Sequence, residues 1–179
     1  MKSFLTLKHW QVFLILIVGS VLCNLTIEGD QLSTMIVEIV GVVVYSLWPI
    51  IVGNELNQLL PKKIEVNFSF FLINIFISLG TMITVLILSS GEGMTFSGLY
   101  AIPLLYVFFA YLYCLAFPVK LLNSIETGKE ASSGQYIGDF FLVLFLPIGI
   151  WFLQPRINKI VADRKLATLH TENSDATTY

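Results

Sequence analysis

The chain has 179 residues, of which 56 % are hydrophobic and only 12 % are charged, and its formal net charge is −2. An average soluble domain is about 25 % charged, so this chain lacks the polar surface that a folded domain needs in water. The composition excludes an ordinary soluble domain and predicts a polytopic membrane protein that has the lipid bilayer as its surroundings. Nothing in the charge balance favours a nucleic-acid partner.

Four apolar stretches are long enough to cross a membrane. A helix of about 20 apolar residues crosses the hydrocarbon core. We therefore expect an all-α fold, with four transmembrane helices packed as a bundle in a single domain over residues 1–153. The first stretch also has the form of a signal peptide with a small-residue site at Val18-Gly19-Ser20, but its apolar run continues past that site, which favours a retained span. The predicted spans are residues 10–27, 32–53, 68–88 and 98–117.

The distribution of lysine and arginine predicts the orientation. Cytoplasmic loops of membrane proteins are enriched in these residues. The two connections expected outside, Glu28–Gln31 and Ser89–Ser97, contain acids and no base. With the N-terminus in the cytoplasm, the first six bases fall in the N-terminal segment and in two inner loops, the second of which is predicted over Pro118–Gly138. These six bases are Lys2, Lys8, Lys62, Lys63, Lys120 and Lys129.

A fifth apolar run lies in the segment 139–153, where Pro147 and Gly149 interrupt it. Runs of 10–14 apolar residues are more often re-entrant or interfacial than spanning, and proline and glycine weaken a continuous helix. We predict a re-entrant or interfacial apolar helix, with a fifth span as the alternative. In the first arrangement Asp139 and Arg156 return to one surface and can form a structural charge pair. In the second they lie on opposite sides of the membrane.

The segment after this run is polar and basic. Residues 154–170 place Ile157, Ile160, Val161 and Leu169 near one helical face. This pattern predicts a basic amphipathic helix on the inner membrane surface, or simply a positively charged stop after a membrane segment. Residues 171–179 are polar and are predicted to be disordered.

Glu38 is the one acid well inside a predicted span, and none of the four spans contains Lys or Arg. A lone carboxylate in hydrocarbon is expensive, so we expect a neutral, hydrogen-bonded side chain. It is either a proton- or cation-responsive group in a pathway or an acid that fixes helix packing. Its candidate partners at similar depth are Asn24, Thr81, Thr84, Tyr100 and Tyr106.

The chain approaches one catalytic motif without completing it. The nearest approach to an intramembrane aspartyl protease is Tyr136-Ile137-Gly138-Asp139, which lacks the first glycine of that motif, and H-E-x-x-H is absent. The two cysteines lie in apolar runs without a histidine at metal-ligand spacing. We expect no enzymatic activity, no cofactor and no metal.

Two stretches of the chain have a pattern of their own. They are Gly53-Asn54-Glu55-Leu56-Asn57 with Leu60-Pro61, and Tyr136-Ile137-Gly138-Asp139-Phe140-Phe141 followed by Pro147-Ile148-Gly149-Ile150-Trp151 and Gln154-Pro155-Arg156-Ile157-Asn158. These stretches resemble a family of small polytopic inner-membrane proteins of Bacteroidota to which no activity is assigned. The resemblance implies a bacterial inner (cytoplasmic) membrane location and carries no reaction, substrate or site residue.

These observations lead to one main functional hypothesis and two others. The main hypothesis is a non-enzymatic accessory or structural subunit that acts through helix–helix contacts with a membrane protein partner or a second copy of itself. A small oligomeric transporter or channel that uses Glu38 is the second. The third is an immunity-type membrane protein, which fits the size of the chain but rests on no particular residue.

Overall fold

The computed structural model describes residues 4–89 and 98–176, and the side-chain environments up to Leu166 except those of Tyr100 and Lys165. Within these ranges the chain is helical and contains no strand, which confirms the predicted all-α class. Six α-helices and one short 3₁₀ turn follow one another along the chain. They are α1 (His9–Leu22), α2 (Gln31–Leu59), α3 (Phe68–Ser89), η1 (Gly98–Tyr100), α4 (Ala101–Thr127), α5 (Ser133–Leu144) and α6 (Leu146–Ala176).

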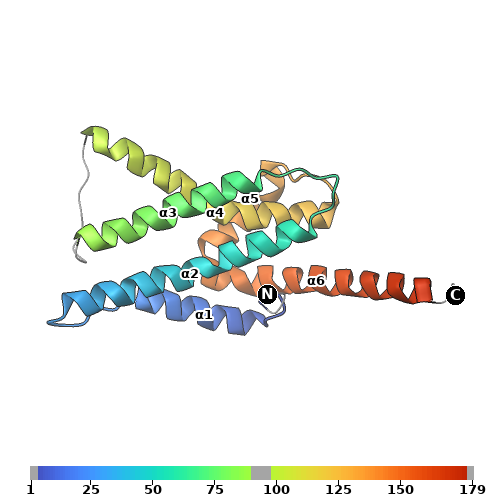
Figure 1. Ribbon diagram of the computed structural model, residues 1–179, viewed down its shortest axis with the longest axis horizontal. Helices are drawn as coiled ribbons and strands as arrows, with labels where there is room; N and C mark the ends of the chain where they lie inside the picture. The colour runs from blue at the N-terminus through green and yellow to red at the C-terminus, as the bar shows by residue number, and fades with distance from the viewer. Residues whose placement is uncertain (1–3, 90–97, 177–179) are drawn as a thin grey trace.

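The four N-terminal helices form two pairs. Helix α1 packs along α2, helix α3 packs along α4, and α2 joins the pairs through contacts with α3 and α4. The α2–α3 and α4–α5 connections lie at one end of the molecule, and the α1–α2 connection lies at the opposite end (Figure 1). The core between the pairs is built on large side chains such as Trp48, Phe71 and Leu121, which are almost fully buried.

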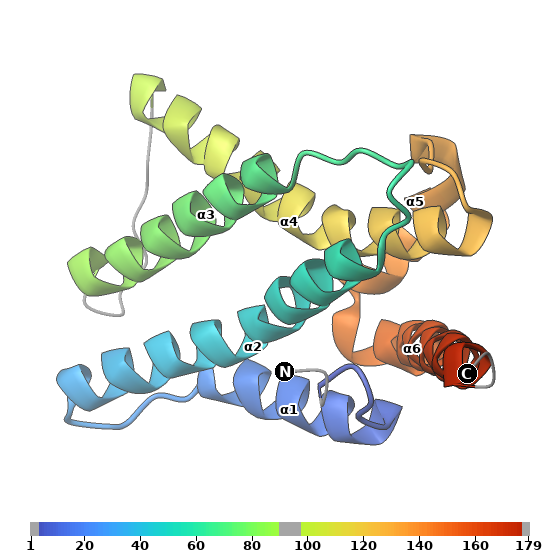
Figure 2. The same cartoon turned by 45° about the vertical axis from the view of Figure 1, so that its right-hand side comes forward.

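Helices α5 and α6 close the first end of this bundle. In Figure 2 helix α6 is seen almost along its axis while α1–α4 are seen from the side, so α6 runs steeply across the direction of the other long helices. Phe145 interrupts the helix between α5 and α6. Gly149 packs so closely on α5 that an added Cβ atom would collide with the carbonyl group of Leu142. A glycine at this position is therefore what allows the two helices to meet.

Short-range capping bonds explain where several helices begin. The Asp30 carboxylate accepts a hydrogen bond from the Ser33 amide at 3.0 Å, and Asn67 accepts one from the Phe70 amide at 3.0 Å. The amide of Ser132 donates to the Gln135 side chain at 2.9 Å. Such side chains satisfy backbone groups that the first turn of a helix leaves without partners.

Three helices, α2, α3 and α4, are long and apolar enough to cross a membrane. Of the predicted spans, 68–88 agrees with α3 within a residue, and 32–53 and 98–117 lie in the longer helices α2 and α4 apart from the 3₁₀ turn at 98–100. The prediction for 10–27 is only partly correct, because α1 has 14 helical residues and ends at Leu22. The chain packs closely on α2 at this end, since a Cβ atom on Gly41 of α2 would lie 2.5 Å from the Cys23 amide nitrogen.

The extent of α4 corrects the predicted loop over Pro118–Gly138. Helix α4 continues through Pro118 to Thr127, and α5 begins at Ser133. The extension is helical because its apolar side chains have a core to pack against: Leu121 and Leu122 are at most 1 % exposed. Only a short connection is left between α4 and α5.

The C-terminal predictions are also revised. Residues 154–170 belong to α6, but Ile157 and Ile160 of their apolar face are buried in the core of the protein, and Val161 packs against that core. A face predicted to contact lipid is thus covered by protein. The side chain of Leu169 lies outside the described part. Helix α6 extends to Ala176, so 171–176 of the segment predicted to be disordered are helical, and 177–179 lie outside the described residues.

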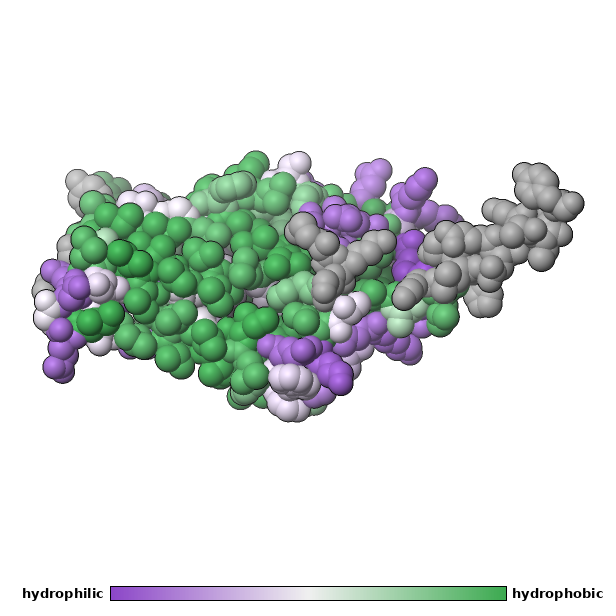
Figure 3. Space-filling view, turned by 60° about the horizontal axis from the view of Figure 1, so that its bottom comes forward, coloured by the Kyte–Doolittle hydropathy of each residue, from purple (hydrophilic) through white to green (hydrophobic). Residues whose placement is uncertain are grey.

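The surface carries the apolar character that the composition predicts. In the most apolar 18-residue stretch of each helix, only 28 % of the residues are buried in α2, 22 % in α3 and 33 % in α4. Figure 3 shows a broad hydrophobic surface with hydrophilic residues gathered toward the ends of the molecule. A surface of this kind is suited to a bilayer, which solvates apolar side chains.

Candidate functional site

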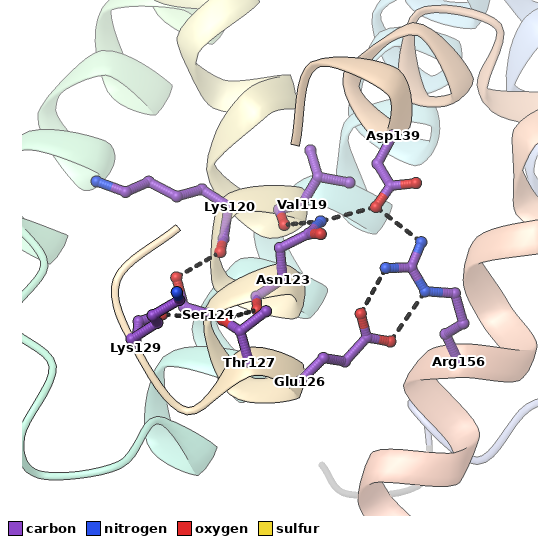
Figure 4. A network of polar contacts seen from close by, with 9 residues as sticks. All are labelled: Val119, Lys120, Asn123, Ser124, Glu126, Thr127, Lys129, Asp139 and Arg156. Atoms are coloured by element: carbon purple, nitrogen blue, oxygen red, sulfur yellow. Dashed lines mark hydrogen bonds and ion pairs between the residues drawn. The ribbon is translucent and has the colours of Figure 1, made fainter. Parts of the chain in front are cut away.

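The main polar cluster of the described chain joins α4, α5 and α6 and contains Asn123, Glu126, Asp139 and Arg156 (Figure 4). We call these four residues the polar junction. Arg156 Nη1 lies 2.7 Å from Asp139 Oδ2. Its Nε and Nη2 donate to the two carboxylate oxygens of Glu126 at 2.9 and 2.5 Å. The side-chain amide of Asn123 donates to Asp139 at 2.7 Å and thereby links this carboxylate to α4.

Arg156 is therefore held by two carboxylates from two other helices. The hydrogen bonds with Glu126 and then Asp139 raise the pKa of the Arg156 guanidinium above its ordinary value, although partial burial acts in the opposite direction. The guanidinium stays charged at every physiological pH, and it joins three elements by directional bonds. Its arrangement suits a fixed structural tie, because each of its three nitrogens already donates to the protein.

The structure brings together the two residues that the sequence predicts as a charge pair. The apolar run of 139–153 does not form one continuous helix, since it divides at Phe145 into the end of α5 and the start of α6. A continuous helix of about 14 residues would place its ends roughly 21 Å apart. The 2.7 Å contact between Asp139 and Arg156 is the one expected of a segment that turns back on itself, and one straight helix could not form it.

A cleft of about 560 Å³ lies beside the polar junction, between the C-terminal end of α4 and α6. It contains side chains of both charges, so it lacks the single sign that marks a site for a strongly charged ligand. Arg164 at its edge donates to the carbonyl oxygen of Leu59 at 2.7 Å, which ties α6 to the C-terminal end of α2. The cleft is lined by Ile125, Glu126, Arg156, Lys159, Ile160, Asp163 and Arg164.

Glu38 has a different environment from the one predicted. It is half-buried on α2, and its Oε2 atom is buried without a hydrogen-bond partner among the described residues. Asn24 donates instead to the Ser20 carbonyl, and Thr84 donates to the Gly80 carbonyl. No bond joins Thr81 to Glu38 in the described part of the chain.

Tyr106 also has a partner other than Glu38. Its hydroxyl donates to Asn74 Oδ1 at 3.3 Å, and Asn74 in turn donates to the Phe70 carbonyl. The predicted intramembrane site is thus divided into separate pieces. Asn74 is 2 % exposed and joins α3 to α4, a role that its position in an apolar stretch could have indicated.

Sequence reasoning missed a second buried polar tie. Gln154 is fully buried, and its amide donates to the carbonyl oxygens of Leu5 and Leu7, both at 3.2 Å. Asn158 donates to Leu7 as well, at 3.2 Å. These bonds attach the segment before α1 to α6, which lies near the other end of the chain. Gln154 lies directly after the apolar run of 139–153, and only its burial in the structure distinguishes it from a polar residue at the end of a membrane segment.

Cys23 and Cys114 are both free thiols in the described part of the chain. Within the described ranges no three His, Cys, Asp or Glu side chains come together in a way that could hold a metal ion.

The fold and these ties define an all-helical protein with three helices that are suited to crossing a membrane and a polar junction at one end. No family model matches the chain, and the comparisons with curated proteins and with solved structures gave no match.

Proposed function

We propose that this is a multi-pass protein of the bacterial inner membrane whose N-terminus lies in the cytoplasm. The apolar surfaces of α2, α3 and α4 support the membrane location. The choice of the bacterial inner membrane rests on the sequence resemblance alone. Lys62 and Lys63 lie in the α2–α3 connection and Lys129 lies in the α4–α5 connection, both at the same end of the molecule (Figure 1). Basic residues favour the cytoplasmic side.

Helix α1 supplies the fourth crossing in this proposal. Its 14 residues rise about 21 Å, and the non-helical residues 23–27 that follow it extend the path toward the outer surface. Helices α5 and α6 lie at the inner interface. The steep orientation of α6 across the bundle supports this arrangement (Figure 2), as do the exposed aromatic side chains of Phe141, Phe145 and Trp151. Aromatic residues concentrate at membrane interfaces.

Cysteine labelling in intact cells tests the topology. In a chain whose two native cysteines are replaced by serine, an impermeant thiol reagent is expected to label Thr26→Cys in the α1–α2 connection. It should leave Ser174→Cys near the C-terminus unlabelled until the cells are opened. Ready labelling of Ser174→Cys in intact cells would mean that the chain crosses the membrane an odd number of times.

The proposed activity is that of a non-enzymatic accessory subunit that acts through helix–helix contacts. The observation that carries it is the start of α4. Ile102, Leu105, Phe108 and Phe109 are each more than half exposed, and their spacing places them on one side of the helix. Tyr106 between them is bonded to α3. Aromatic side chains are enriched where proteins meet, so this end of α4 offers a surface for a second membrane helix.

Site-specific photo-cross-linking in cells tests this contact. A photoreactive residue at Phe109 is expected to give one protein adduct of defined mass, which is either a partner subunit or a second copy of the chain. Val18 on α1 is a matched control, because it is 53 % exposed but lies on another helix. It is expected to give lipid adducts only. Lipid adducts alone from both positions would contradict the subunit proposal.

The buried Oε2 atom of Glu38 favours a second candidate, a small transporter or channel. An ionisable group inside a membrane segment is a functional hypothesis by default. Purified protein in vesicles would then conduct protons or cations, and Glu38→Gln would abolish the flux. Glu28→Gln, in the exposed α1–α2 connection, is the control and should leave the flux unchanged. Absence of flux in the unmodified protein would reject this candidate.

A further inference from the structure

Two opposite charges in the cleft between the end of α4 and α6 have no partner among the described residues. The volume of this cleft, about 560 Å³, falls within the roughly 300–1,000 Å³ that is typical of small-molecule sites. Lys159 and Asp163 line it from α6, and both side chains are exposed. Within the described part of the chain neither of them has a hydrogen bond or an ion pair. One ammonium and one carboxylate are therefore available to a ligand.

The basic side chains that share the cleft are already held by the protein. Arg156 donates from each of its three nitrogens to Glu126 or Asp139, and Arg164 donates to the Leu59 carbonyl. The ammonium and the carboxylate that remain come from positions four residues apart on α6. Such positions lie side by side on a helix, with about 5–6 Å between their Cβ atoms. The cleft thus presents one positive and one negative group next to each other.

The charges around the cleft balance one another. The acid that pairs with the polar junction and the charged residues that line the cleft have no net charge together: they are Glu126, Asp139, Asp163, Arg156, Lys159 and Arg164. Binding surfaces are complementary in charge to their ligands. A purely anionic headgroup would therefore find no excess of positive charge here, whereas a zwitterion finds a partner for each of its two charges.

The cleft also has an apolar part, and α6 carries aromatic side chains next to it in the chain. Ile125 of α4 and Ile160 of α6 line the cleft. Trp151 and Phe152, on the first turns of α6, are 47 % and 60 % exposed. Aromatic side chains concentrate at the depth of lipid headgroups, and α6 runs across the end of the bundle (Figure 2). An apolar wall beside two charges at this depth favours a lipid over a dissolved ligand.

We propose that the cleft binds the headgroup of a zwitterionic phospholipid with a primary amine, which is the chemistry of phosphatidylethanolamine. The phosphate accepts hydrogen bonds from Lys159, since lysine is a common partner of phosphate groups. The ammonium group, which has three hydrogens to donate, donates to the Asp163 carboxylate. The glycerol end of the lipid lies against Ile125. This proposal rests on the membrane location and on the position of α6 at the inner interface, both proposed above.

Native mass spectrometry of the full chain in detergent tests the site. The chain is titrated with phosphatidylethanolamine, phosphatidylcholine and phosphatidylglycerol that share the same acyl chains. Phosphatidylethanolamine is expected to bind several-fold more tightly than the other two. The quaternary ammonium of phosphatidylcholine cannot donate a hydrogen bond to a carboxylate, and phosphatidylglycerol has no cation. Lys159→Gln and Asp163→Asn should each reduce the binding of phosphatidylethanolamine several-fold and remove this preference.

Lys62→Gln and Glu65→Gln are the matched controls and should retain the preference. Both positions are exposed in the α2–α3 connection, at the same end of the molecule (Figure 1), and neither lines the cleft. All four variants change exposed side chains, so each is expected to fold. Equal binding of the three lipids, tighter binding of phosphatidylglycerol, or a preference that persists in both α6 variants would overturn the proposal. Competition by free O-phosphoethanolamine at the concentration of the lipid would indicate a dissolved ligand and would overturn it as well.

Flotation with phosphatidylcholine vesicles separates this proposal from the membrane location on which it rests. A chain that floats with the vesicles but shows no preference among the three lipids contradicts the lipid site alone. A chain that remains below the vesicles contradicts the membrane location and the lipid site together.

Discussion

Arg156 Nη1 and Asp139 Oδ2 lie 2.7 Å apart across the turn between α5 and α6, although 17 residues separate them in the chain. The pair joins the two ends of the apolar segment 139–153 and thereby holds α5 and the start of α6 in their turned-back arrangement. Because Glu126 holds the other side of the same guanidinium, α4 is tied to this turn as well.

Asp139→Asn is expected to lower the free energy of unfolding by about 1–2 kcal/mol, because it removes a charged partner from a half-buried guanidinium. SDS titration in mixed micelles measures this quantity. The control is Lys120→Gln, which breaks an ion pair of equal length whose acidic partner, Glu130, is 57 % exposed. Solvent screens such a pair, so its loss should have the smaller effect. Equal effects of both substitutions would contradict a structural role for the polar junction.

Asp139→Arg is expected to disrupt folding, because it places a second cation beside Arg156. The paired exchange with Arg156→Asp should restore the expressed, folded fraction only in part. The restored contact between positions 139 and 156 would be accompanied by repulsion between the new aspartate and Glu126, since like charges at short range repel. Size-exclusion chromatography in mild detergent measures the folded fraction. No restoration in the double variant would argue against direct contact between the two positions.

Gly149→Ala is expected to destabilise the protein by about 3 kcal/mol or to prevent folding, since overfilling a packed contact costs roughly 1–3 kcal/mol and sometimes more. The added Cβ atom would meet the backbone of Leu142, which has no flexible end that could move aside. Gly138→Ala on α5 is the matched control, because a Cβ atom added there would have no neighbouring atom within 4 Å. At that position the better helix propensity of alanine should stabilise the helix by up to about 1 kcal/mol. Equal tolerance of both substitutions would exclude the close α5–α6 contact.

Gln154→Leu is expected to lower the free energy of unfolding by about 1–3 kcal/mol, because it leaves the buried carbonyl group of Leu5 without a donor and leaves that of Leu7 with Asn158 alone. The segment before α1 should then detach first, and limited proteolysis should cut it at a higher rate. Gln135→Leu at the exposed start of α5 is the control and should leave that rate unchanged. An unchanged rate for Gln154→Leu would show that α1 holds this segment by itself.

Acidification provides a test of the α2 cap. Hydrogen bonds from Ser33 hold the pKa of the Asp30 carboxyl below its ordinary value of 3.8. A carboxyl whose folded pKa is depressed contributes stability above its unfolded pKa and loses it as the pH falls through the folded pKa. As the pH falls from about 5 to below 3.8, the unfolding temperature of the unmodified protein should therefore fall by more than that of Asp30→Asn, which keeps a cap but cannot titrate. Parallel curves for the two proteins would contradict this linkage.

Much of the fold follows from local sequence. The apolar runs of α2, α3 and α4 indicate membrane-suited helices because hydrophobicity over about 20 residues needs no knowledge of neighbouring elements. The break within 139–153 could also be inferred from the sequence. Pro147 and Gly149 weaken a helix at their own positions, whatever elements lie near them. The Asp139–Arg156 contact could be predicted from sequence as well, because a segment that turns back brings its two ends together.

Other features depended on partners that are distant in the chain. The helical extension of α4 beyond Pro118 forms because Leu121 and Leu122 find a core, which no local pattern specifies. Glu126, Asn74 and Gln154 acquire their roles only when α6, α4 and the N-terminal segment approach them. For the same reason Glu38 could be recognised from sequence as an unusual acid but could not be assigned its surroundings.

The amino-acid sequence by itself determined that this chain is helical and suited to a membrane, because hydrophobicity and backbone preference are properties of consecutive residues. Only the tertiary structure decided which polar groups meet. A hydrogen bond requires two atoms within about 3 Å of each other, and the packing of helices from distant parts of the chain sets that distance.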